Sequence, residues 1–136
     1  MNIIIFGGSG FIGSRTAQIL KEQGHQVCTP DRRAFDFLHP DKTAVRRLLE
    51  GQDILINGIG IMSRHAEILE TVHHRTPKQL AAWAKAAGIK RWVQLSALGA
   101  DYMKTPFCFY FRQCLPLPCL RHHTRMPVHF RSLLLS

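Results

Sequence analysis

The pattern with the clearest chemical meaning is a run of glycines near the start of the chain, in the sequence GGSGFIG at positions 7–13. Gly7 permits a tight turn, Gly10 lets a phosphate approach the backbone with no Cβ atom in the way, and Gly13 lets a following helix pack closely. The first N–H groups of such a helix and its dipole attract phosphate. The residues predicted to line this phosphate site are Gly7, Ser9, Gly10, Phe11, Ile12 and Gly13.

An acidic residue, Asp31, follows the glycine run at about the 20-residue distance expected of a group that binds the ribose hydroxyls of a dinucleotide. Arg32 and Arg33 come directly after it and suit the 2′-phosphate of NADP. The acid favours NAD, and the arginines keep NADP open. A second interpretation of this segment is a solvated turn that binds no ligand.

The glycine run lies between patterns that predict a strand and a helix. Short apolar runs typical of strands occupy residues 2–6, 25–29, 53–57 and 91–95. Apolar residues at helical spacing occupy residues 10–23, 42–50 and 68–87, the last as one long helix or as two joined near Pro77. This alternation predicts an α/β Rossmann-type fold with a doubly wound parallel sheet, incomplete at its C-terminal side. Ligands of such sheets bind beyond the carboxyl ends of the strands.

Five short motifs, taken in order, resemble the short-chain dehydrogenase/reductase superfamily. They are the glycine run, the spacing to Asp31, the pair Asp36-Phe37, the sequence NGIG at positions 57–60 and the sequence LSA at positions 95–97. The closest branch is the extended or atypical one, which includes nucleotide-sugar epimerases, NAD(P)H-binding regulator-like proteins and the nucleotide-binding accessory subunit of respiratory complex I. The resemblance covers about residues 1–106 and implies NAD or NADP as the cofactor.

The resemblance also implies roles for the residues that follow the second and third predicted strands. Asp36 and the backbone of Phe37 would lie at the adenine, while Asn57 and Gly58 would pass beneath the adenosine and its ribose. Gly60 belongs to the same cofactor-binding loop. Simpler interpretations stay open, with Asp36 as an ordinary turn acid and Asn57-Gly58 as a turn dipeptide.

Catalytic residues of the family are only partly matched. Ser96 falls at the family's catalytic serine position near the nicotinamide, although a helix cap would use the same residue. Catalytic members also carry a Tyr-x-x-x-Lys pair, in which lysine lowers the tyrosine pKa for proton exchange. Neither Tyr102 nor Tyr110 has a lysine four residues later, and Phe107 and Phe111 stand where that pair would fall. We therefore predict cofactor binding without complete catalytic machinery, with a fragment of an oxidoreductase or a nucleotide-sugar epimerase/dehydratase as the alternative.

The composition of the chain changes near Phe107. The residues after it hold three of the four cysteines, several prolines and no acid. We therefore divide the chain into an NAD(P)-binding Rossmann domain at residues 1–106 and an atypical tail at residues 107–136. A shifted reading frame or a truncated gene would produce such a tail, and the tail is expected to be poorly ordered.

The remaining composition is that of a folded globular protein, with 46% hydrophobic and 20% charged residues. No stretch reaches the roughly 18 consecutive apolar residues of a membrane helix, so we expect no membrane span. A chain that starts directly on a strand predicts a cytoplasmic protein. The cysteines match neither a disulfide framework nor a metal-ligand spacing, and no metal site is expected.

The formal charge of +9 is uneven, because the residues from Tyr102 onward hold five basic side chains and no acid. A basic chain attracts nucleic acid, but no aromatic platform or known module accompanies the charge, and nucleic acid is not an expected partner. His65, His73 and His74 fall on a mostly polar helical stretch and are expected on the surface. The sequence leaves the oligomeric state open.

Overall fold

The computed structural model describes residues 1–95 and contains one parallel sheet in the strand order β2-β1-β3-β4. The strands are β1 (Asn2–Phe6), β2 (Gln26–Cys28), β3 (Ile54–Asn57) and β4 (Arg91–Gln94). All three pairings are parallel, so the carboxyl ends of the strands meet at one edge of the sheet. The four predicted strands are confirmed, each slightly shorter than or equal to its apolar run.

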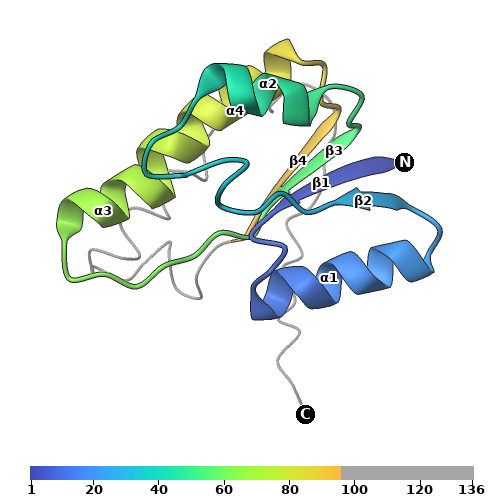
Figure 1. The fold of residues 1–136 in the computed structure, drawn as a ribbon, viewed down its shortest axis with the longest axis horizontal. Coiled ribbons are helices and arrows are strands. Elements are labelled where there is room, and N and C mark those ends of the chain that lie inside the picture. Colours follow the sequence, from blue (N-terminus) through green and yellow to red (C-terminus); the bar gives the residue numbers. More distant parts are fainter. Residues whose placement is uncertain (96–136) are drawn as a thin grey trace, which may run out of the picture.

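Helices cover both faces of this sheet, as Figure 1 shows. The helices are α1 (Phe11–Glu22), α2 (Lys42–Leu49), α3 (Ala66–Glu70) and α4 (Thr76–Ala86). Ile3 and Ile5 of β1 pack with Ala17 on the α1 face, whereas Ile4 and Phe6 point into the larger core beneath α2 and α4. This alternation of neighbouring side chains confirms the doubly wound arrangement.

Helix ends follow local rules that the sequence already contains. Asp41 caps α2 by accepting a hydrogen bond from the Thr43 N–H at 2.8 Å. Gly24, Gly51 and Gly88 follow α1, α2 and α4, and each has a positive φ, between 72° and 84°. Glycine adopts this conformation without the steric cost that a Cβ atom brings, so the helices end where the sequence predicts.

The helical stretch predicted near residues 68–87 is continuous. A five-residue π-helical segment, η1 (Thr71–Arg75), joins α3 to α4. At its end the Thr76 N–H donates to the Thr71 carbonyl, one residue further back than in an α-helix. Pro77 follows directly and has no N–H to donate, so the proline falls where the regular hydrogen-bond ladder is already interrupted.

The boundary predicted between residues 106 and 107 lies outside the described residues, as do Ser96, Tyr102 and Tyr110. Among the helices of residues 1–95, none has the length and apolar character needed to cross a bilayer.

The centre of the larger core offers a test of the fold. Leu55, in the middle strand β3, is fully buried. Leu55→Ala should lower the free energy of unfolding by about 2–5 kcal/mol, because it removes buried methyl groups and leaves a cavity. Urea denaturation measures the change. Ile19→Ala on the exposed side of α1 is the control and should change stability by less than about 1 kcal/mol; equal losses in the two variants would contradict the assigned core.

Candidate functional site

The glycine turn between β1 and α1 presents backbone rather than side chains at the carboxyl edge of the sheet. Gly7 has φ of 83°, and its carbonyl accepts a hydrogen bond from the Gly10 N–H at 3.0 Å. Gly10 is the N-cap of α1, and within residues 1–95 no side chain caps the first N–H groups of the helix. The first turn also contains no acidic residue. The positive end of α1 is therefore open to an anion.

Gly7 and Gly13 are fixed by close packing against backbone. A Cβ atom on Gly13 would overlap the Gly7 carbonyl, and one on Gly7 would lie 2.9 Å from the carbonyl carbon of Gly58. Gly13 thus brings α1 against the turn itself. Gly10 differs, because among the described residues a Cβ atom there would meet only the Gly7 carbonyl oxygen, at 3.3 Å, and its φ of −77° suits any residue. Packing alone therefore does not require glycine at position 10.

The other predicted residues of the glycine run lie on the surface. Ser9 is exposed, and the side chains of Phe11 and Ile12 are 87% and 54% exposed. These residues border the open end of α1. They are placed beside the predicted phosphate site, and their contacts with a ligand stay a prediction.

Asp31 is exposed in the loop after β2, and its carboxylate is engaged locally. Its Oδ1 accepts hydrogen bonds from the N–H groups of Arg33 at 3.0 Å and Ala34 at 2.9 Å. Such bonds are expected if this segment is a solvated turn, which was the second interpretation of the sequence. They occupy one carboxylate oxygen, so they do not oppose the ribose-binding role, which stays a prediction.

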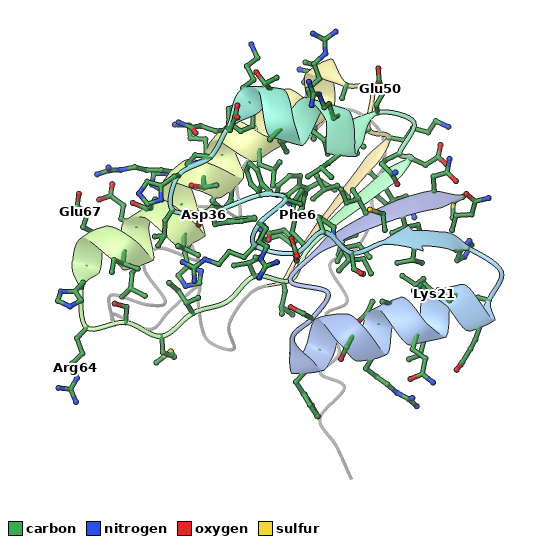
Figure 2. All side chains as sticks on the ribbon, viewed as in Figure 1. Phe6, Lys21, Asp36, Glu50, Arg64 and Glu67 are labelled. Carbon is green, nitrogen blue, oxygen red and sulfur yellow. The ribbon has the colours of Figure 1, made fainter. Side chains whose placement is uncertain are left out.

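Asp36 lies further along the same loop and is held as a carboxylate. The Leu38 N–H donates to its Oδ1 at 2.9 Å and lowers the pKa of Asp36, with further help from His39 and Arg32. The His39 Nδ1 lies 3.2 Å from Oδ2, and the Arg32 Nε lies 3.7 Å from Oδ1. In Figure 2, Asp36 lies on the side of the sheet that carries α3 and α4. An ionised hydrogen-bond acceptor is thus fixed at the edge of the sheet.

A cavity of about 410 Å³, which we call the loop pocket, lies between the loops that follow β2 and β3. Its wall is mainly apolar, with Arg32 and Asp36 as its charged members. The lining residues are Arg32, Phe35, Asp36, Phe37, Leu38, Ile59, Ile61, Met62, Ser63, Ile68 and Val72. An apolar slot with one fixed acceptor suits a flat heteroaromatic ring that bears an amino group.

The rings of Phe6, Phe35 and Phe37 pack against one another, with centroids 5.3–5.7 Å apart, and join the pocket wall to the end of β1. The Phe37 side chain is buried in this cluster. The role of the Phe37 backbone at the adenine, which the family resemblance implies, stays a prediction. This cluster also links the loop pocket to the glycine turn, which follows Phe6.

The Asn57 side chain is buried and holds two elements together. Its Nδ2 donates to the Gln94 Oε1 at 3.0 Å, and its Oδ1 accepts from the Ile59 N–H at 3.2 Å. Gly58 donates its N–H to the Phe6 carbonyl at 2.9 Å and lies against Gly7. These two residues shape the edge of the site with their backbone, and the Asn57 amide points into the protein. Gly60 is exposed, and no atom of the part of the chain that the structure describes lies within 4 Å of its Cβ position.

The surface prediction for the histidines is wrong for His73. His65 is exposed and His74 half-buried, but His73 is only 2% exposed, and its Nε2 lies 3.0 Å from the Ile61 carbonyl oxygen. Helical spacing already places His73 on the inner face, because the buried residues Leu69, Thr76 and Leu80 lie four, three and seven residues from it. The polar character of the neighbouring residues misled the prediction. Thr76 was missed as well: it is buried, and its Oγ1 donates to the Phe37 carbonyl at 2.6 Å. The one feature of the sequence that could have drawn attention to Thr76 was the proline that follows it, Pro77.

Burial of His73 has a consequence for stability that depends on pH. Loss of solvation lowers the pKa of His73 below the usual value of 6.5, so the folded chain binds a proton there less readily than the unfolded chain. The free energy of unfolding should fall as pH decreases from about 6.5 through the folded-state pKa and should gain nothing from His73 above 6.5. Urea unfolding between pH 8 and pH 5 measures this. In His73→Gln the free energy of unfolding should depend less steeply on pH, because the variant lacks the His73 proton site. His74, whose pKa is also lowered by burial, is present in both proteins and does not affect the comparison. Equal pH dependence in the two proteins would contradict the burial of His73.

The comparisons with known proteins identify the family and the fold of this chain. A family model described as the NAD dependent epimerase/dehydratase family matches residues 3–104. The mouse (Mus musculus) protein NADH dehydrogenase (ubiquinone) 1 alpha subcomplex subunit 9, mitochondrial, is 28% identical over 117 residues, which cover 71% of this chain and 31% of that protein. The chain thus spans about a third of the length of the curated relatives it matches.

Solved structures share the fold. A short-chain dehydrogenase/reductase superfamily protein from Agrobacterium tumefaciens with bound NAD is 20% identical with a TM-score of 0.73, over 87% of this chain and 44% of that one. A dTDP-4-dehydrorhamnose reductase from Bacillus anthracis in complex with NADP is 11% identical with a TM-score of 0.71, over 88% and 48% of the two chains. At these identities the likeness establishes the Rossmann-type fold. The family match over residues 3–104 shows that the chain belongs to the NAD dependent epimerase/dehydratase family.

Proposed function

We propose that this chain binds NAD or NADP at the carboxyl edge of its sheet. The observation that carries the proposal is the contact between the glycine turn and the loop after β3. A Cβ atom on Gly7 would lie 3.0 Å from the Ile59 N atom, and Ile59 lines the loop pocket. The open end of α1 and the loop pocket are therefore neighbours, as the two ends of an adenosine diphosphate require.

The residues fit the parts of the cofactor in a consistent order. The N–H groups at the start of α1 would hold the pyrophosphate, and the loop pocket would hold the adenine. The Asp36 carboxylate would accept from the amino group of the adenine, and Asp31 with Arg32 would lie at the adenosine ribose. When bound, the nicotinamide supplies a site for hydride transfer.

Binding without complete catalytic machinery is the form of the proposal that the sequence favours. The family's tyrosine and lysine have no counterpart at the expected spacing, and Ser96 is the one candidate at a catalytic position. The alternative is an oxidoreductase or epimerase/dehydratase fragment, which the family description and the reductase from Bacillus anthracis support. Turnover of an offered sugar nucleotide or carbonyl substrate would favour that alternative.

The extent of the binding unit and its location belong to the same proposal. We propose that residues 1–106 form the dinucleotide-binding domain and that residues 107–136 add a tail of different character. We also propose a cytoplasmic location, although the mouse relative has a mitochondrial name. The distribution of the tagged full chain between cell fractions tests this location.

Titration with NADH and NADPH tests the binding proposal. A ligand that binds the folded chain must raise its thermal midpoint, because binding adds to the free energy of unfolding. Gly10→Ala should weaken NADH binding at least tenfold while the unliganded midpoint changes little, since Gly10 has an ordinary φ and only one close neighbour. Ala82→Leu, at an exposed position of α4, is the control and should bind like the unaltered chain. No shift with either nucleotide at millimolar concentration would overturn the proposal.

The choice between the two nucleotides tests the role of Asp31. Its exposed carboxylate would repel the 2′-phosphate of NADPH, so Asp31→Asn should raise the affinity for NADPH relative to NADH about fivefold, the equivalent of about 1 kcal/mol at 4 Å in water. Asparagine keeps an oxygen that can accept the two turn hydrogen bonds, so the fold of the loop should survive. Isothermal titration calorimetry at two ionic strengths measures the ratio; an unchanged ratio would place the ribose away from Asp31.

A further inference from the structure

The helical run formed by α3, η1 and α4 contacts both loops that make the loop pocket. One loop follows β2 and the other follows β3, and they come from strands that are not neighbours in the sheet. Figure 1 shows the run crossing beside the loop after β2. The distance between the two pocket walls therefore depends on how each loop is attached to this run.

Thr76 attaches the loop after β2. Its hydroxyl donates to the Phe37 carbonyl at 2.6 Å, and the residue is 1% exposed. Phe37 lines the loop pocket, and its neighbour Asp36 supplies the pocket's carboxylate. A buried carbonyl that loses its donor is costly, so this single bond fixes the backbone beside the acceptor.

His73 attaches the loop after β3, one helical turn before Thr76. Its Nε2 lies 3.0 Å from the Ile61 carbonyl oxygen, and the ring is 2% exposed. Ile61 lines the opposite wall of the loop pocket. The two side chains therefore hold the two walls from one rigid element.

Val72, directly before His73, completes this arrangement, because it is buried and lines the loop pocket. All three side chains project from η1 or from the first residue of α4. The π-helical hydrogen bond from Thr76 to Thr71 lies in the same stretch. Single π-helical turns of this kind often mark functional sites.

We infer that Thr76 and His73 are positioning residues that set the width of the loop pocket for the adenine end of the dinucleotide. The inference rests on the proposed function and extends it to residues that need not touch the cofactor. According to this inference, the helical run determines how tightly the adenine end is bound, and the glycine turn determines how tightly the pyrophosphate is bound.

The test compares variants that remove or retain each attachment, with AMP and NADH as probes in isothermal titration calorimetry. Thr76→Val keeps the shape of the side chain and loses the donor, so the backbone of Phe37 is no longer held beside the pocket and both probes should bind about tenfold more weakly. Thr76→Ser retains the donor and should stay within about threefold of the unaltered chain. His73→Leu should weaken both probes, and His73→Gln, which keeps a donor at the corresponding position, should recover most of the loss.

A destabilised control separates positioning from general stability. Ile5→Val removes a methyl group from the core on the α1 face, away from the loop pocket, and should lower the thermal midpoint without changing the affinity for AMP. If the unaltered chain binds neither probe, the proposed function fails and this inference with it. If the unaltered chain binds and Thr76→Val binds equally well, or if Ile5→Val loses as much affinity as Thr76→Val, the inference alone is overturned.

Discussion

The rest of the site depends on one close approach between backbone segments. Gly13 of α1 packs against Gly7 with no room for a Cβ atom, and Gly7 in turn packs against Gly58 after β3. Three pieces of chain from different elements therefore meet through backbone alone. Because protein interiors are close-packed, a methyl group on Gly7 or on Gly13 would force these pieces of chain apart. The open end of α1 and the wall of the loop pocket are placed by this contact.

Much of the architecture was predictable because local rules agree with one another. Apolar runs of the right length gave the strands, and Gly24, Gly51 and Gly88 marked the helix ends. The glycine turn was predictable for the same reason, since the tight turn and the close packing of the helix depend on residues that are near one another in the sequence. The loop pocket was different. Its volume depends on the distance between two loops, and no pattern within either loop contains that distance.

The two attachments of those loops were predictable to different degrees. A regular helical period places His73 on the same face as the buried residues Leu69, Thr76 and Leu80, so its burial could have been predicted from the spacing. The hydroxyl of Thr76 reaches a carbonyl 39 residues away, a pairing that no spacing rule encodes. Asp31 and Asp36 show the reverse case, because their local turn bonds follow from sequence while their access to a ligand depends on the fold. The family resemblance implies roles for these residues that local chemistry alone leaves undecided.

The Asn57 amide has a consequence for how freely this chain can vary. One end of the side chain is a donor used by β4, and the other is an acceptor used by the loop that lines the pocket. Aspartate would lose the donor, leucine would lose both ends, and serine is too short to span them. The exposed Asp31 can be exchanged for another turn-forming residue at little structural cost. Substitution should therefore be tolerated along the rim of the site and resisted beneath it, at a residue that no ligand need ever reach.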